Sequence, residues 1–207
     1  MLKLLGRSSS INVRKVLWLC EELKLSIAQE EWGTASLSTQ LPEFLALNPN
    51  ATVPVIVDGA HVLWESNTIC RYLAGREGRG DLLPTTPVER SRVEQWMDWQ
   101  ATELNTSWSY AFMAMVRQSP AHGDPEAIAT SVSEWNRHMR ILDDQLALTG
   151  AFAAGSNFTL ADIVLGLSTN RWFMTPMERP RLTAVERYFE RLSERPAFLR
   201  HGRNGTP

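Results

Sequence analysis

The stretch that decides the fold covers residues 52–66 and reads TVPVIVDGAHVLWES. Its apolar and largely β-branched run at 53–57 predicts a strand, and the Asp58-Gly59 pair that stops this run predicts a tight hairpin turn. Residues 61–64 then form the returning antiparallel strand, and a helical pattern follows at 66–73. We therefore expect a β-β-α unit here.

Pro54 is the unusual residue of this unit, because proline inside a strand removes a donor from the hydrogen-bond ladder. A bulge or a cis peptide bond at Pro54 frees the backbone of Val53 to face a ligand. Alternatively, the run is an edge strand. Periodicity alone does not choose between these two interpretations.

Toward the N-terminus, short apolar runs alternate with a helical pattern. Residues 2–5 predict a strand that stops at Gly6, residues 12–23 carry apolar side chains at helical spacing, and residues 27–32 predict a second strand. After a loop, the hairpin at 53–64 follows. The order is thus β-α-β, a loop, and β-β-α.

A domain boundary is indicated at residues 75–81, GREGRGD, which combine charges with three glycines and contain no apolar side chain. We place an N-terminal domain at 1–75, a linker at 76–86 and an all-helical domain at 87–207. Four helical patterns begin in the second half, each at a residue suited to a first turn: Pro87 (to about Val116), Pro125 (to about Leu148), Thr159 and Pro180.

The composition is that of an ordinary globular protein, since 43% of the 207 residues are hydrophobic and 21% are charged. The net charge of -2 and the scattered basic residues disfavour nucleic acid as a partner. The four histidines lack ligand spacing, which disfavours a metal site. No apolar run is long enough for a signal-peptide core or a membrane span. Cys20 and Cys70 resemble core thiols in a reducing compartment, so we expect a cytoplasmic protein.

Two polar segments are candidates for chemistry. The loop from Ser8 to Asn12 joins the first strand to the first helix, and a hydroxyl there that donates to a thiolate lowers the pKa of the thiol. Its serines could equally cap the helix that begins near Asn12. Glu65-Ser66 lies at a helix N-terminus, which suits a carboxylate or phosphate, although Ser66 could simply cap its own helix.

Taken together, the order and spacing of these features resemble the cytosolic glutathione S-transferase family across essentially the whole chain, and in particular its bacterial, theta-like members that use a serine. The combination is specific, whereas each motif alone is not. The matching segments are residues 8–16, 44–54, 64–73, 158–163 and 195–198.

The resemblance implies a thioredoxin-like domain of order β-α-β-α-β-β-α followed by a helical bundle. It also implies that glutathione is the co-substrate and that no metal takes part. Within the family pattern Pro54 is cis, and Val53, beside Thr52, pairs its backbone with the cysteinyl part of glutathione. Glu65 and Ser66 hold the γ-glutamyl end.

Two further pairings follow from the resemblance. Asp98 corresponds to an acidic residue that reaches the glutathione amine across a homodimer interface. Thr159 and Asp162 form a structural capping box, outside the site.

For the activating residue, the resemblance selects Ser10, with Ser9, Ser8 and Asn12 as alternatives one or two residues away. The loop contains no tyrosine or cysteine, which argues against the classes that use those residues. The nucleophile is then the thiolate of glutathione itself.

The implied second substrate is a small electrophile, halogenated compounds included. Its apolar wall is expected from Trp108, Phe112 and Met113, and Arg117 is either an exposed helix-end residue or a group that steers an anionic substrate. The alternatives are a glutathione-dependent dehalogenase, isomerase or peroxidase, or a ligand-binding dimer without catalysis.

Overall fold

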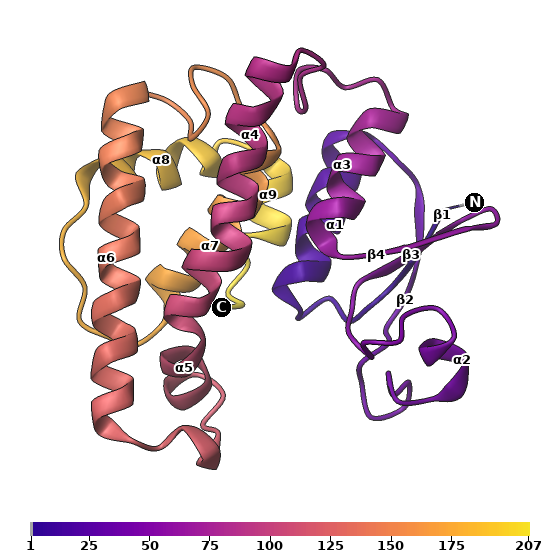
Figure 1. Ribbon diagram of the computed structural model, residues 1–207, viewed down its shortest axis with the longest axis horizontal. Coiled ribbons are helices and arrows are strands. Elements are labelled where there is room, and N and C mark those ends of the chain that lie inside the picture. The colour runs from indigo at the N-terminus through magenta and orange to yellow at the C-terminus, as the bar shows by residue number, and fades with distance from the viewer. Residues whose placement is uncertain (1) are drawn as a thin grey trace.

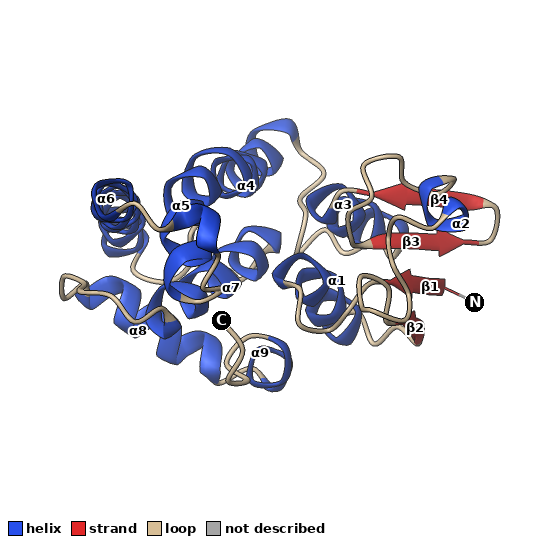
Figure 2. Cartoon of the chain, turned by 90° about the horizontal axis from the view of Figure 1, so that it is seen from below, coloured by secondary structure: helices blue, strands red, loops and turns tan. Residues whose placement is uncertain are grey.

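The computed structural model describes residues 2–207. Within these residues one mixed sheet has the strand order β2-β1-β3-β4 (Figure 2). The strand β1 is parallel to β2 and antiparallel to β3, which is antiparallel to β4. The strand bounds are β1 Leu2–Leu5, β2 Ile27–Glu30, β3 Val55–Asp58 and β4 His61–Trp64.

The helices of the first half are α1 (Ile11–Glu22), α2 (Pro42–Leu45) and α3 (Ser66–Arg76). Helices α1 and α3 pack against each other and lie between the sheet and the helices of the second half (Figure 2). Their apolar faces and the fully buried strand partners Leu4 and Ile56 belong to one hydrophobic core. The order β-α-β-α-β-β-α is confirmed, and this half is a thioredoxin-like domain.

The second half is helical among the described residues, as the sequence predicts. Helix α7 is buried along almost its whole length, whereas α6 runs along the side farthest from the sheet (Figure 1). The bounds are α4 Pro87–Trp99, η1 Gln100–Leu104, α5 Asn105–Met115, η2 Pro120–His122, α6 Pro125–Thr149, α7 Leu160–Met174, α8 Thr183–Ser193 and α9 Pro196–His201.

Several sequence-based boundaries are wrong. The strand expected at 53–57 begins at Val55, because Pro54 has no N–H to donate to the ladder. The single helix expected from Pro87 to about Val116 is interrupted by the π-helical turn η1, which adds a residue to the repeat. Pro180 does not open a helix, since the chain stays extended until α8 starts at Thr183.

The predicted capping box at the start of α7 is present. The Asp162 carboxylate is fully buried and accepts hydrogen bonds from the backbone N–H groups of Thr159 (2.8 Å) and Ala153 (3.0 Å). It also accepts from the Tyr188 hydroxyl (3.1 Å). Burial raises the pKa of Asp162 to about 6, against the opposing effect of these donors. One carboxylate thus ties together three segments of the helical domain.

A buried lysine joins the two domains. The Lys15 side chain, on α1, is only 2% exposed, and its Nζ donates to Asn67 Oδ1 on α3 (3.1 Å) and to Gln100 Oε1 on η1 (2.9 Å). The Asn67 amide donates to the carbonyl oxygen of Met97 on α4 (2.9 Å), and the Gln100 amide donates to the Ser168 hydroxyl on α7 (3.0 Å). We call Lys15, Asn67, Gln100 and Ser168 the interface network.

Sequence reasoning missed this network, although a signal was available. Lys15 stands four residues from both Ile11 and Leu19, so it lies on the buried stripe of α1. Burial lowers the pKa of Lys15 to about 8, with a smaller opposing contribution from Cys70. A lysine on an apolar stripe therefore marks a polar contact across an interface.

Replacing Asp162 by alanine removes the acceptor of several buried donors. We expect Asp162→Ala to lower the free energy of unfolding by ~3 kcal/mol, because each unsatisfied buried donor costs about 1–3 kcal/mol. Urea unfolding measures the change. The exposed Asp144 on α6 gives the control Asp144→Ala, for which a change within ~0.5 kcal/mol is expected. Equal losses for both variants would contradict this role of Asp162.

Lys15 should make stability depend on pH above neutrality. Its pKa is about 8 in the folded protein and 10.5 as the ordinary value, so the folded state binds fewer protons between these limits. The unfolding free energy from this group therefore rises with pH in that window, by ~2 kcal/mol from pH 7.5 to 9.5.

Other groups titrate in the same range, so the difference between variants is the measurement. Urea unfolding at both pH values should show this rise in the wild type and in the exposed control Lys24→Met, but not in Lys15→Met. Parallel pH profiles for all three proteins would rule out the buried charge as their cause.

Candidate functional site

The strand register brings three loops to the same end of the sheet. Leu5 pairs with Val55, and Val55 pairs with Trp64, so the three residues form one row across β1, β3 and β4. The loop after Leu5, the turn before Val55 and the junction after Trp64 all start from this row. They contain the candidate residues found in the sequence.

Gly6 allows the first of these loops to approach the second. Its φ is 155°, and a Cβ at this position would lie 2.5 Å from Val13 Cγ2 and 3.1 Å from Val53 Cβ. The Gln29 amide donates to the Gly6 carbonyl oxygen at 2.8 Å. We call residues 8–12 the serine loop. A side chain at position 6 would thus push this loop away from Val53.

The serine loop leaves some hydroxyls available. Ser10 is the N-cap residue of α1, but its side chain does not cap the helix, so the capping interpretation is wrong for this residue. Ser8 donates to Glu31 Oε1 at 2.6 Å and is already engaged. The side chains of Ser9, Ser10 and Asn12 make no hydrogen bond within residues 2–207.

The turn before β3 presents the backbone of Val53. The Val53-Pro54 peptide bond is cis, as the resemblance implies, and β3 is an inner strand, so the edge-strand alternative is wrong. The buried Asn48 amide fixes the turn by donating to the carbonyl oxygen of Thr52 at 2.8 Å. The main-chain groups of Val53 have no hydrogen-bond partner among the described residues.

The junction between β4 and α3 forms a place for an anion. Glu65 is the N-cap of α3 with a positive φ of 73°, and Ser66 is the first helical residue. The Glu65 side chain does not cap the helix, and the Ser66 side chain is 6% exposed. First-turn N–H groups and the positive helix end favour a negative charge here. Asn67 of the interface network follows directly, so Lys15 adds a positive charge behind this position.

Asp98 lies on α4 with a 66% exposed side chain and pairs with Arg71 of α3. Within this chain, Asp98 belongs neither to the row of Leu5, Val55 and Trp64 nor to the three loops that start from it. Its predicted contact across a dimer stays a prediction.

The residues predicted for the electrophile wall surround an arginine. Trp108 and Phe112 are buried on α5 and in edge-to-face contact, whereas Met113 is partly exposed. The Arg171 guanidinium of α7 lies over both rings, with its Cζ 4.5 Å from the Trp108 centroid and 4.0 Å from the Phe112 centroid. Sequence reasoning missed Arg171, although its spacing from Val164 and Leu167 places it on the buried helix.

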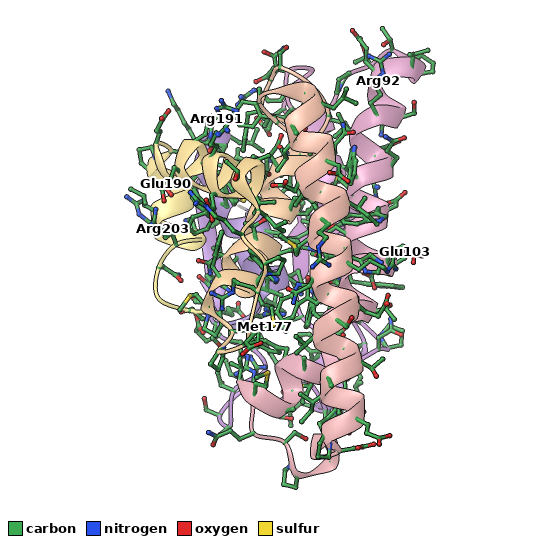
Figure 3. All side chains as sticks on the ribbon, turned by 90° about the vertical axis from the view of Figure 1, so that its left-hand side faces the viewer. Arg92, Glu103, Met177, Glu190, Arg191 and Arg203 are labelled. Carbon is green, nitrogen blue, oxygen red and sulfur yellow. The ribbon has the colours of Figure 1, made fainter. Side chains whose placement is uncertain are left out.

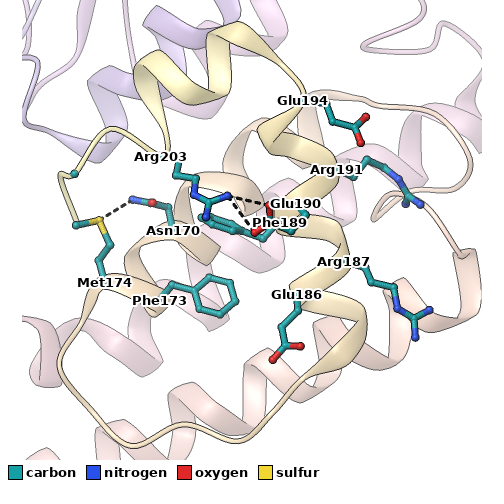
Figure 4. Close-up of a pocket in the computed structure, with 11 residues that line it drawn as sticks. Asn170, Phe173, Met174, Glu186, Arg187, Phe189, Glu190, Arg191, Glu194 and Arg203 are labelled. Atoms are coloured by element: carbon teal, nitrogen blue, oxygen red, sulfur yellow. Dashed lines mark hydrogen bonds and ion pairs between the residues drawn. The ribbon is translucent and has the colours of Figure 1, made fainter.

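A large cavity of about 920 Å³ lies elsewhere, between α7, α8 and the segment around Gly205 (Figure 4). Phe173 and Phe189 line it, and the Arg203–Glu190 ion pair stands at its rim. Figure 3 shows Glu190 and Arg203 together on the outer side of the helical domain. None of the candidate residues in the three loops lines this cavity, so its size alone does not make it the site.

Residues 2–207 contain no cluster of three metal-ligating side chains. The helices of this described part also lack the length and apolar character that a membrane span requires.

Two family profiles match this chain. Residues 1–75 match the family profile "Glutathione S-transferase, N-terminal domain", and residues 106–196 match "Glutathione S-transferase, C-terminal domain". The chain is 37% identical over 202 residues to glutathione S-transferase GstB of Escherichia coli, which covers 95% of each protein.

A solved structure is equally similar. The theta class glutathione S-transferase of Xanthomonas axonopodis pv. citri with glutathione bound superimposes with a TM-score of 0.92 at 36% identity, covering 100% of this chain and 99% of that one. The chain also matches 45% of a probable elongation factor 1-gamma of Arabidopsis thaliana, at 30% identity over 89% of this chain. The profiles and the full-length similarity establish that this chain belongs to the glutathione S-transferase family.

Proposed function

We propose that this protein is a glutathione transferase that activates the thiol of glutathione for attack on a small electrophile. The single observation that carries this proposal is the convergence of the serine loop, the Val53-Pro54 turn and the α3 N-terminus on one strand row. A peptide with a thiol and a carboxylate needs three groups: a hydroxyl for the sulfur, unpaired main-chain groups for the peptide backbone and an anion site for the carboxylate.

In the proposed complex, the α3 N-terminus and Ser66 hold the γ-glutamyl carboxylate, and Glu65 contacts the same end of the peptide. The unpaired main-chain groups of Val53, beside Thr52, form hydrogen bonds with the cysteinyl part of glutathione, as a neighbouring strand would. Asp98 reaches the amine of glutathione from the second subunit of a homodimer. The domain division at 1–75 and 87–207 then separates glutathione binding from electrophile binding.

Ser10 activates the sulfur. Its hydroxyl, which has no partner within the described chain, donates a hydrogen bond to the thiolate and so lowers the pKa of the thiol. The thiol proton leaves to water, the sulfur forms a bond to an electrophilic carbon, and the leaving group departs with the bonding electron pair. Holding both reactants in one cleft adds the advantage of proximity.

The same thiolate could serve a dehalogenase, an isomerase or a peroxidase, and assays of a haloacid, an aromatic chloride and a hydroperoxide side by side distinguish these reactions. A carrier without catalysis is the other alternative, and failure to bind glutathione in calorimetry would favour it over a transferase. The two buried free cysteines suit a cytoplasmic enzyme. A role in detoxification belongs to the same proposal, because conjugation to glutathione consumes the electrophile.

Ser10→Ala tests the activating hydroxyl. Because a hydrogen bond to a charged group contributes about 1.5–3 kcal/mol, we expect the thiol pKa of bound glutathione to rise by about 1–2 pH units and kcat near neutral pH to fall ~10–100-fold. Ultraviolet absorbance of the bound thiolate against pH measures the first quantity.

Ser8→Ala is the matched control, because its hydroxyl is engaged with Glu31. If Ser10→Ala leaves both quantities unchanged, Ser9→Ala and Asn12→Ala identify the donor instead.

Ser66→Ala tests the anion site. We expect the KM for glutathione to rise ~10-fold with little change in kcat, because the lost hydrogen bond holds the carboxylate in both ground and transition states. Thr68→Ala, an exposed residue in the same helical turn, should keep the wild-type KM. A fall in kcat at constant KM would place Ser66 at the sulfur rather than at the carboxylate.

A further inference from the structure

Arg171 is a buried cation without a counter-charge. Its side chain is 4% exposed, and its guanidinium makes no hydrogen bond or ion pair with any residue in the described range 2–207. Its polar contacts are limited to the faces of Trp108 and Phe112. Charged side chains at this depth are normally paired, because an isolated buried charge is costly.

Two more arginines stand close to it. Burial lowers the pKa of Arg171 to about 9, and repulsion from Arg14 and Arg117 adds to the shift. Arg117 lies over the Phe112 ring as well, with its Cζ 5.5 Å from the centroid. Arg14 is buried, and burial and Arg117 lower its pKa to about 10. We call Arg14, Arg117 and Arg171 the arginine cluster.

Arg14 is the only member of the arginine cluster with polar partners in the described chain, and Arg117 is exposed to solvent. Arg14 donates to the main-chain oxygens of Thr206 and Pro207, both at 2.8 Å, and to Asn204 Oδ1 at 3.3 Å. No carboxylate of the described residues pairs with Arg117 or Arg171. Cation–π contact contributes about 0.5–2 kcal/mol, which is less than the cost of a buried, unpaired charge. The planar donor fork of Arg171 is thus free for an anion.

The arginine cluster adjoins the site of the proposed reaction. Arg14 lies one turn after Ser10, and its backbone N–H donates to the Ser10 carbonyl oxygen at 2.9 Å. The other two members stand beside the rings predicted to form the electrophile wall. We assign an anion bound there to the second substrate, because the rings predicted for the electrophile wall surround Arg171. Of the two carboxylates of glutathione, Ser66 and the α3 N-terminus hold the γ-glutamyl one in the proposed complex. The glycyl carboxylate is the rival anion, and its binding to Arg171 would give equal losses on the two substrates compared below.

We propose that the electrophile carries a carboxylate, which Arg171 binds together with Arg117. This inference rests on the proposed transferase function and names its substrate class: electrophiles with an acidic group beside an apolar body. A planar, bidentate arginine–carboxylate pair fits the fork, and the rings of Trp108 and Phe112 fit the apolar body.

A matched pair of aryl chlorides tests the substrate class. With 4-chloro-3-nitrobenzoate, the thiolate sulfur bonds to the chlorine-bearing ring carbon, chloride leaves with the electron pair, and the carboxylate is unchanged. The neutral partner 4-chloro-3-nitrobenzamide reacts in the same way but cannot form the ion pair. Comparing variants on each substrate cancels the difference in their intrinsic reactivity.

We expect Arg171→Met to lower kcat/KM for the benzoate ~10–100-fold and for the benzamide less than ~3-fold, since a charge-assisted hydrogen bond contributes about 1.5–3 kcal/mol. The control Arg181→Met, at an exposed arginine, should retain wild-type values for both. Equal losses on the two substrates, or none, would overturn the inference.

A binding measurement keeps the test independent of turnover. 4-Nitrobenzoate should raise the Tm of the wild type and of Arg181→Met but not that of Arg171→Met, and 4-nitrobenzamide should raise none of them. If 4-nitrobenzoate stabilises Arg171→Met as well, the carboxylate is bound elsewhere and the inference is wrong. If the wild type neither binds glutathione nor conjugates it to 1-chloro-2,4-dinitrobenzene, the proposed function itself is wrong.

Discussion

The buried ammonium group of Lys15 is the interaction on which the arrangement of the two domains depends. Lys15 belongs to α1 and donates to Asn67 on α3 and to Gln100 on η1 of the helical domain. Asn67 in turn donates to α4, and Gln100 donates to α7. Because a buried ammonium group needs these acceptors, the domains have one favourable docking position. The residue next to Asn67 is Ser66, so the same constraint fixes the anion site relative to the helical domain. The π-helical turn begins at Gln100, which places the irregular turn at the contact with Lys15.

Local patterns were sufficient to predict most of the thioredoxin-like domain. The strand at 2–5 and the turn after Asp58 depend on neighbouring residues, and both occur as expected. The capping box of Asp162 is also local, because its partner Thr159 is three residues away. The interruption of the long helix begins at Gln100, which contacts Lys15 and Ser168. Both partners are distant in sequence, so no local pattern contains these contacts.

The candidate site was predicted from segments at element boundaries, which contain Ser10, Val53 and Ser66. The strand register places these boundaries at the same end of the sheet. Arg171 was not found, because an arginine near the end of a helix resembles a solvated residue until the packing of α5 against it is known. A cation on a buried helix is informative when its neighbours at helical spacing are apolar. Arg171 and Lys15 both follow this rule: the pattern marks each cation as buried, whereas its contact partners are known only from the packing of other helices.

The strands β3 and β4 also have an end opposite to the three loops. The hairpin turn at Gly59-Ala60 joins Asp58 to His61 at the far end of β3 and β4 from Val55 and Trp64, about 10 Å away at ~3.3 Å per residue. A Cβ added at Gly59 would meet no atom within 4 Å, although the φ of 61° favours glycine at this position. This turn is therefore a natural attachment point: an inserted peptide, a fluorophore or a surface linker placed there would leave the loops on the other side undisturbed. The domain can acquire new attachments at one end while the candidate site lies at the other.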